Sequence, residues 1–358
     1  MESIKKRISR NQQIKYGYYQ LLDHLIGREK GHKLTENSRR KFYQKLFHTL
    51  KKEGKGKVLP IERRSNLSIE EFKNHYVKKG IPVVLDAAAK DWDCVKNWSF
   101  DYFKNLYGKD EIVVVDQHDM TAPYQRMTLA DVINGIKNGS NQYYRFYPLL
   151  EKHPEHILDF DYKWLRERRN KLTVFEAFQV FIGGDKTLTN LHNANQCNLF
   201  TQVVGEKKWR LYHSFHTAIV DPLPVENVYR SAPLRKNNEP FNPFEADFEA
   251  PFALYEYIDS YEVHLKPGDV LWNPPFYWHA VQNIGESIGV GYRWLPPLYC
   301  YNISPFYSFL DTIAKNPPIW KAYKLYQQDI NLIHMAQFGQ LEKYKNEIAA
   351  DQATSNRS

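Results

Sequence analysis

The second half of the chain is dominated by short apolar segments separated by turn residues, and this pattern constrains the fold more than any other feature. From about residue 174 onward, segments rich in β-branched and aromatic residues recur at short intervals, with glycine and proline between them. Many short strands in quick succession are typical of an antiparallel sandwich or jelly roll. We therefore predict a mainly β fold with helical extensions, whose strands lie at 175–182, 198–204, 208–213, 261–264, 269–273, 278–282 and 287–294.

The first part of the chain has apolar residues at helical spacing instead. These residues predict one helix over 3–27, ending at Gly27, and a second helix over 35–50. Lysine and glycine then alternate in a predicted linker up to residue 57. Much of the formal net charge of +8 lies in this part of the chain. A solvated helix face is the simpler interpretation of this charge, and attraction of phosphate or an acidic peptide is the alternative.

The region between the two patterns contains helix-start signals and short apolar runs. Ser68, Ser99 and Thr128 are predicted N-caps, and each precedes an apolar helical pattern. Strands are predicted at 81–85, 112–115 and 143–147. After residue 302, helices are predicted at 306–313 and 319–338.

We predict four regions along the chain. They are a basic helical extension at 1–57, a jelly-roll domain at 58–300, C-terminal helices at 301–350 and a disordered tail at 351–358. A long insertion at 214–259, rich in proline and acidic residues, interrupts the jelly-roll domain. Because it is long for a plain connection, we expect it to act as a lid or as a substrate-facing loop.

Several classes of protein do not fit the sequence. The three cysteines are far apart and form no CxxC pair, which argues against a disulfide framework and a structural zinc site. The first residues are charged, and no long apolar run follows, so we expect a cytoplasmic protein without a membrane partner. Zinc-finger spacing and aromatic RNA-binding motifs are absent from the sequence, so nucleic acid is not an expected partner.

Two stretches of sequence carry the most specific signal. One covers residues 189–212, beginning TNLHNA and ending GEKKWRLY, and the other covers residues 266–283, KPGDVLWNPPFYWHAVQN. Together they resemble the JmjC-like cupin hydroxylases. These are non-haem iron, 2-oxoglutarate-dependent oxygenases, and they include the asparaginyl hydroxylase acting on hypoxia-inducible factor. The resemblance covers residues 58 to 300 and implies a double-stranded β-helix (jelly-roll, cupin) core.

The resemblance implies an iron site built by two strands. In the family, a His-x-Asp pair and a distal histidine bind one face of Fe(II), and the open positions take 2-oxoglutarate and oxygen. His192 matches the first histidine and His279 the distal one. A lone histidine on a strand is more often a packing residue, but two histidines in these motif contexts favour metal ligands. Ala194 stands where the family has aspartate, and a methyl group cannot bind a metal ion.

Three interpretations of Ala194 remain open. In the first, chloride or water replaces the carboxylate, an arrangement that resembles the 2-oxoglutarate-dependent iron halogenases, which have Ala or Gly there. In the second, the protein is a catalytically inactive cupin scaffold that binds a ligand or a partner. In the third, the aspartate was replaced to trap a complex, or another side chain supplies the ligand. Nearby polar candidates for that ligand are Asn193, Asn195, Asp185 and His213.

The resemblance also implies a pocket for 2-oxoglutarate. Lys207 lies fifteen residues after His192, where the family places the lysine that pairs with the far carboxylate. An ammonium group inside a barrel is costly unless paired, and a dicarboxylate provides the partner. Thr189, three residues before His192, matches a hydroxyl that binds the same carboxylate. Asn198 matches a family position near the cofactor.

The expected activity is hydroxylation or halogenation of an unactivated C–H bond. The substrate would be an amino acid, a peptide or a related small molecule, with Fe(II), 2-oxoglutarate and, for halogenation, chloride as cofactors. The insertion at 214–259 and the strand at 143–147 are predicted to shape the substrate pocket. Terminal helices of this family often form dimers, so the helix at 319–338 is a predicted homodimer interface by analogy.

Overall fold

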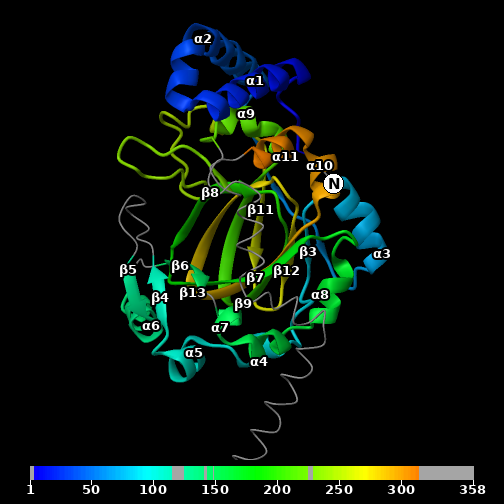
Figure 1. Ribbon diagram of the computed structural model, residues 1–358, viewed down its shortest axis with the longest axis vertical. Coiled ribbons are helices and arrows are strands. Elements are labelled where there is room, and N and C mark those ends of the chain that lie inside the picture. The colour runs from blue at the N-terminus through cyan, green and yellow to red at the C-terminus, as the bar shows by residue number, and fades with distance from the viewer. Residues whose placement is uncertain (1–3, 115–124, 141–142, 148, 225–228, 314–358) are drawn as a thin grey trace, which may run out of the picture.

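The computed structural model describes residues 4–114, 125–140, 143–147, 149–224 and 229–313. Within these residues, eleven strands form one sheet that folds around itself, and helices cover it from opposite sides (Figure 1). A second, two-stranded sheet contains β4 (Glu111–Val114) and β5 (Gln125–Thr128). The predicted mainly β core with helical extensions is confirmed.

Two long antiparallel strands form the centre of the large sheet. They are β9 (Cys197–Tyr212) and β13 (Trp278–Leu295), which pair along almost their whole lengths. The other edge of β13 pairs first with β8 (Leu188–Ala194) and then with β7 (Phe175–Gly183). Outside these lie β10 (Tyr229–Ser231), next to β8, and β6 (Tyr143–Tyr147), next to β7.

The free edge of β9 is also shared by two strands. β11 (Ser260–Leu265) pairs with its second half and β12 (Val270–Asn273) with its first half. β1 (Val58–Pro60) extends the sheet beyond β11, while β3 (Val83–Leu85) and β2 (Arg63–Arg64) extend it beyond β12. The interior between the two halves of the sheet is filled by an apolar cluster that includes Phe181, Phe200, Trp209, Leu211, Leu271, Tyr277 and Val281.

The sequence analysis divided each central strand into two, and the structure shows why this was wrong. Gly205 lies in the predicted gap between strands 198–204 and 208–213, but it is a bulge within β9, with a φ of 63°. A Cβ at Gly205 would lie only 1.9 Å from the carbonyl oxygen of Glu286 on β13. The register of the β9–β13 pair shifts between Ile284 and Ile288, beside this close approach. The bulge therefore bends both strands and lets them serve both halves of the sheet.

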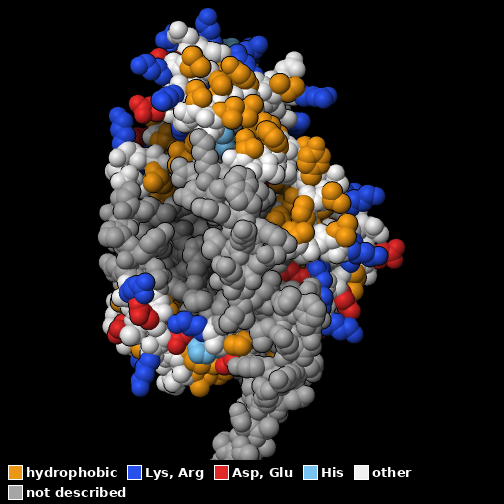
Figure 2. Space-filling view, in the orientation of Figure 1, with side chains coloured by type: hydrophobic (Ala, Val, Ile, Leu, Met, Phe, Trp, Pro, Cys, Tyr) orange, Lys and Arg blue, Asp and Glu red, His pale blue; other side chains and the backbone are white. Residues whose placement is uncertain are grey.

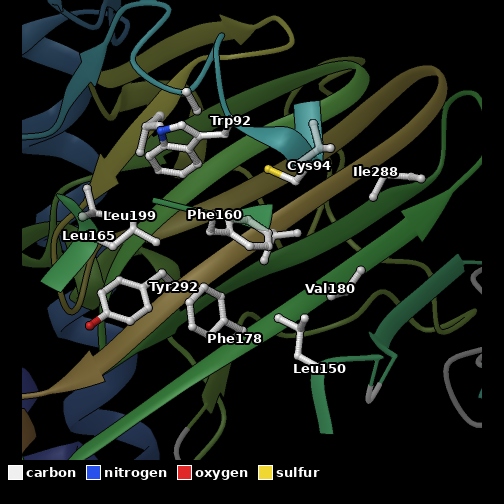
Figure 3. Packing of buried hydrophobic residues seen from close by; sticks show 14 of the residues in the cluster. Trp92, Cys94, Leu150, Phe160, Leu165, Phe178, Val180, Leu199, Ile288 and Tyr292 are labelled. Atoms are coloured by element: carbon white, nitrogen blue, oxygen red, sulfur yellow. The ribbon is translucent and has the colours of Figure 1, made fainter. Parts of the chain in front are cut away.

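One outer face of the sheet is covered by the helices between residues 69 and 168. The predicted caps are confirmed, since the hydroxyls of Ser68, Ser99 and Thr128 accept from backbone N–H groups at 3.1, 3.0 and 3.1 Å. Figure 3 shows Trp92, Phe160 and Leu165 packed with side chains of β7, β9 and β13 in this layer. The elements are α3 (Ile69–Glu71), η1 (Phe72–Val77), α4 (Asp93–Asn97), α5 (Phe100–Tyr107), α6 (Leu129–Lys137), α7 (Leu149–Lys152), η2 (Pro154–Asp159) and α8 (Tyr162–Arg168).

The N-terminal helices cover the opposite outer face of the sheet. They are α1 (Arg10–Ile26) and α2 (Arg28–Glu53), and α2 starts earlier than predicted, directly after Gly27. Leu46 and Leu50 of α2 pack in one buried cluster with Trp278 of β13. Part of the basic charge of this region is used internally, because Arg7 pairs with Asp259 at 2.8 Å and Arg39 with Asp23 at 2.6 Å.

The insertion at 214–259 belongs to the same layer. It contains η3 (Ser214–His216), α9 (Thr217–Val220), β10 and η4 (Tyr255–Tyr257). Its side chains Phe241, Phe252 and Tyr255 are buried with those of α1 and α2, so the described part of the insertion is a packed wall. His216 of η3 is fully buried, and its Nε2 lies 3.2 Å from the carbonyl oxygen of Lys5.

The described chain ends with two short helices. α10 (Pro297–Ile303) was not predicted, while α11 (Pro305–Thr312) matches the helix expected at 306–313. Asp311 of α11 forms a buried ion pair with Arg230 of β10. The predicted helix at 319–338 and the predicted tail lie outside the described residues. Among the described helices, none has the length and apolar character that crossing a membrane requires.

Two glycine substitutions test the bulge in β9. Gly285 and Gly205 both have positive φ, but only at Gly205 would a Cβ meet another strand. Gly285→Ala should therefore lower the free energy of unfolding by about 1–2 kcal/mol, the cost of the left-handed backbone alone. Gly205→Ala should cost more than about 4 kcal/mol. Urea unfolding measures both, and equal losses would show that the two strands do not approach this closely.

Candidate metal and cofactor site

The structure brings His192 and His279 together. They lie directly opposite each other on β8 and β13, with ring centroids 4.2 Å apart and ring planes inclined by 52°. Directly opposed residues of neighbouring strands have their side chains on the same face of the sheet. Two histidines that are 87 positions apart in the sequence (279 − 192) therefore share one small volume.

Backbone contacts fix the orientation of both rings. The Nδ1 atom of His192 lies 2.7 Å from the carbonyl oxygen of Asn190, and that of His279 lies 3.0 Å from the carbonyl oxygen of Tyr277. A carbonyl oxygen only accepts, so Nδ1 is the donor in each ring, and the lone pair lies on Nε2. Burial lowers the pKa of His279 to about 4, which keeps that ring neutral at pH 7. A neutral ring oriented in this way suits metal coordination through Nε2.

A bulge in β8 places Thr189 on the same face as His192. Residues three apart on a regular strand point to opposite faces. Here His192 is opposite His279, while Thr189 is opposite Val281, so three steps along β8 match two steps along β13. The bulge therefore turns Thr189 toward the interior, where its side chain is buried.

Lys207 is fully buried on β9, opposite Asn283 of β13. Its ammonium group donates to the side-chain oxygen of Asn283. The amide of Asn283 in turn donates to the hydroxyl of Thr187 at 2.6 Å. Burial alone lowers the pKa of Lys207 to about 7, so its charge is poised to respond to a bound anion.

Two glycines of β13 leave space beside Lys207 and Asn198. A Cβ at Gly289 would lie 3.0 Å from Cε of Lys207 and 2.3 Å from the ring of Phe200. A Cβ at Gly291 would lie 2.9 Å from the side-chain oxygen of Asn198. Both polar atoms of the Asn198 amide are buried without a hydrogen-bond partner among the described residues. The amide is thus ready for a polar ligand that the described chain does not supply.

Ala194 ends β8 on the same face as His192, and its carbonyl oxygen accepts from the backbone N–H of Phe276 at 2.7 Å. Three of the four suggested substitute ligands have other side-chain contacts: Asn193 donates to the backbone carbonyl of Phe276, Asp185 caps Gly285, and His213 caps Phe215. Asn195 accepts from Cys300 through its backbone carbonyl alone, and its side-chain oxygen is buried without a hydrogen-bond partner among the described residues. In the described ranges, no third His, Cys, Asp or Glu side chain completes a metal-binding group.

Sequence reasoning missed three residues of this site. Asn283 lies four positions after His279, so strand periodicity alone places it on the same face, next to Lys207. Trp209 stacks on His279 at 5.5 Å between centroids, with an interplanar angle of 17°. Arg293 is buried opposite Asn198, and its charge helps to lower the pKa of His279 after the larger effect of burial.

These residues fit the expected cofactors in part. Two oriented imidazoles suit a ferrous ion, and a buried lysine with an unsatisfied amide suits a dicarboxylate. The carboxylate that would complete a facial triad is replaced by the methyl group of Ala194. Any iron held here would have two protein ligands from the described residues.

Comparison with known proteins agrees with the cupin fold. A family model described as the cupin-like domain matches residues 69–298. Lysine-specific demethylase 8 of Xenopus tropicalis is 27% identical over 241 residues, covering 63% of this chain and 51% of the relative. JmjC domain-containing protein D of Dictyostelium discoideum is 26% identical over 250 residues, with coverages of 62% and 53%.

A third relative is covered more completely. The tRNA wybutosine-synthesizing protein 5 of Mus musculus is 24% identical over 293 residues, covering 72% of this chain and 84% of the relative. The chain spans about half the length of the other two relatives. The particular likeness to an asparaginyl hydroxylase stays a prediction.

Replacing Lys207 by methionine should change how stability depends on pH. The folded-state pKa of about 7 lies below the value of about 10.4 for an exposed lysine. Between these two values the unfolded chain binds more protons, so lysine makes the stability of the folded protein rise with pH. The stability advantage of Lys207→Met should therefore shrink from about pH 7 to about pH 10. Urea unfolding measures this difference.

The matched control is Lys208→Met, the same change on the neighbouring, partly exposed residue. The difference in free energy of unfolding between Lys208→Met and the wild type should not change with pH. A Lys207→Met protein whose difference from the wild type is also constant would contradict a lowered pKa for Lys207.

Proposed function

The chain belongs to the cupin-like domain family, and on this premise we propose that it is an iron- and 2-oxoglutarate-dependent oxygenase. The reaction proposed is hydroxylation or halogenation of an unactivated C–H bond. The observation that carries the proposal is the cross-strand pair of His192 and His279, with both Nδ1 atoms bound to backbone carbonyls.

Each residue of the site has a role in this proposal. His192 and His279 hold the iron through Nε2, and the strand register fixes the distance between them. Lys207 binds the far carboxylate of 2-oxoglutarate, assisted by Thr189, and Asn198 provides a further polar contact. Iron and 2-oxoglutarate, when bound, would supply the oxidising power that no protein side chain has.

The apolar surroundings of the site serve the same reaction. Phe200 and Trp209 pack at 4.8 Å between centroids, and Trp209 stacks on His279. These rings exclude water from the space between the imidazoles and Lys207, which strengthens every charge interaction there. Lys207 takes up a proton when a dicarboxylate binds above pH 7, because its pKa rises toward the ordinary value.

Ala194 gives this site a different charge balance from one with the usual aspartate. Arg293 and, when protonated, Lys207 bring positive charge to the site, and no carboxylate from position 194 offsets the metal. An added anion therefore fits the space that Ala194 leaves, and chloride is the anion required for halogenation. Water in the same place corresponds to hydroxylation.

For the substrate, we propose an amino acid, a peptide or a related small molecule. The relatives are named for acting on lysine residues and for synthesizing wybutosine in tRNA. The described insertion packs against the N-terminal helices, and β10 pairs with β8 beside His192. Substrate contacts on this side would therefore come from the vicinity of β10.

A catalytically inactive scaffold is the second candidate, and Ala194 is the observation that favours it. A cupin that has lost a metal ligand can keep its barrel and bind only a ligand or a partner. The buried Lys207, the two glycines beside it and the orphaned amide of Asn198 favour the enzyme. These features are costly in a folded barrel unless a ligand uses them.

Anaerobic binding of 2-oxoglutarate to the Fe(II)-loaded protein tests the proposal without a known substrate. The wild type should show the charge-transfer absorption of an iron–2-oxoacid complex and, with oxygen, should form succinate. His192→Ala and His279→Ala should lose both signals. Lys207→Met should bind 2-oxoglutarate about 10- to 100-fold more weakly, the loss expected for a charged hydrogen bond.

His264→Ala is the matched control, because His264 is an exposed histidine on β11. It should behave as the wild type in both measurements. Absence of the absorption and of succinate in the wild type, with and without chloride, would leave the scaffold as the better candidate.

Chloride dependence tests the position of Ala194. In the wild type, chloride should strengthen iron retention or raise succinate formation, because it supplies the missing anionic ligand. Ala194→Asp should bind Fe(II) at least about tenfold more tightly, a gain of about 1.4 kcal/mol, and should lose the response to chloride. Ala194→Val, similar in size but without charge, should lose the response and gain no affinity. Unchanged iron affinity in Ala194→Asp would show that position 194 does not lie beside the metal.

A further inference from the structure

A second cavity lies outside the barrel, between the N-terminal helices and the insertion. Its volume is about 500 Å³, which is in the range of pockets that bind small molecules. One wall comes from α2 and the other from residues of α9 and the insertion, including Ile219, Val220 and Leu254. The whole α2 wall precedes the region matched by the family model, while the other wall lies inside it, so the cavity needs a segment outside the family match.

The α2 wall is a single helical stripe. Arg40, Tyr43, Gln44 and Phe47 all line the cavity, and their spacing of three and four residues places them on one side of the helix. Phe42, Leu46 and Leu50 face the buried core instead. Thus α2 uses one face to cover the barrel and an adjacent face to build the cavity.

The cavity has an apolar body. Ile219, Val220 and Leu254 line the side opposite α2, and the exposed aliphatic surface there belongs to Leu254, because Ile219 and Val220 are almost fully buried. On α2, the ring of Phe47 stays 40% exposed, although it contacts Tyr257 edge to face at 5.9 Å. Exposed rings facing an aliphatic wall favour a ligand with a flat apolar part.

The charged residues of the cavity leave an excess of one positive charge. Arg28 and Arg40 line it, and Asp221 is the acidic residue beside them. Arg28 pairs with Asp221 at 2.9 Å and also donates to the carbonyl oxygen of Pro222, so its charge is used to hold α2 against the insertion. Arg40 is exposed, and its described hydrogen bond goes to the neutral side chain of Asn37. The guanidinium of Arg40 therefore offers charge to an incoming anion.

The α2 side of the cavity carries further positive charge, whereas the insertion that forms the other wall is rich in acidic residues. Lys41 and Lys45 of α2 are exposed near Arg40, and in Figure 2 basic side chains surround the part of the molecule that contains α1 and α2. This arrangement attracts anions and leaves the apolar walls to select among them.

We propose that this cavity is a second ligand site, which takes a small aromatic monoanion. The aromatic part of this ligand lies between Phe47 and Leu254, and its anionic group contacts Arg40. Simple inorganic anions have no apolar surface to bury against the walls, and neutral aromatic compounds cannot form an ion pair with Arg40. The site is independent of the barrel chemistry, because none of its lining residues belongs to the histidine and lysine site.

The probe for this site is 8-anilinonaphthalene-1-sulfonate, an aromatic monoanion whose fluorescence rises in apolar surroundings. Titration of the full chain should reveal a saturable site of one probe per chain. Gln44→Trp, an exposed residue replaced by a ring that occupies the cavity, should weaken binding at least about tenfold. Arg40→Glu should weaken it about three- to fivefold and remove most of its salt dependence, the size expected for an exposed charge.

Lys45 provides matched controls, since it is exposed on α2 and does not line the cavity. Lys45→Trp and Lys45→Glu should each bind the probe within about twofold of the wild type. The uncharged analogue N-phenyl-1-naphthylamine should bind the wild type more weakly than the sulfonate does. Its affinity for Arg40→Glu should equal its affinity for the wild type. Circular dichroism confirms that each variant is folded.

Three results would overturn the proposal. One is the absence of saturable binding in the wild type. Another is equal binding by Gln44→Trp and Lys45→Trp, which would place the probe elsewhere on the apolar surface. The third is equal loss in Arg40→Glu and Lys45→Glu, which would indicate a general effect of net charge.

Discussion

The register between β13 and its neighbours is the constraint on which the candidate site depends. A strand alternates its side chains, so a shift of one position would turn His279, Val281 and Asn283 out of the interior. The bulge in β8 and the glycine bulge in β9 fix this register from both edges of β13. Histidine pairing, the contact of Lys207 with Asn283 and the inward direction of Thr189 all follow from it. The geometry of the candidate site is therefore encoded less by its histidines and lysine than by the irregular residues that align the strands.

Electrostatics separates this site from a standard member of its family. A triad with aspartate balances part of the metal charge within the protein, whereas this barrel contains buried Lys207 and Arg293 without that carboxylate. Buried positive charge is tolerated when an anion completes it or when the proton leaves. Lys207 has a lowered pKa, so the ligand-free barrel can relax by deprotonation. In the proposed function, the same property would favour anions as ligands, because their binding would restore the charged form.

How much the sequence could predict depended on whether a signal was local. N-caps at Ser68, Ser99 and Thr128 are local hydrogen bonds, and all three were found. The motif contexts of His192 and His279 were sufficient to expect them in one place, which the ring distance of 4.2 Å agrees with. The length of β9 was missed, because a glycine at a bulge and a glycine at a turn look alike in sequence. The burial of His216 was also missed, because it depends on Lys5, about two hundred residues away in the chain.

The packing of α1 and α2 has a consequence for where this protein can be divided. The family match begins at residue 69, yet Leu191, Tyr212 and Trp278 of the barrel are buried by helices that precede it. A fragment trimmed to the matched region would present that aromatic layer to water and leave Asp259 without Arg7. Such a surface is typical of chains that aggregate. The folding unit is thus larger than the segment that the family model matches, and the N-terminal helices form part of the barrel's outer layer.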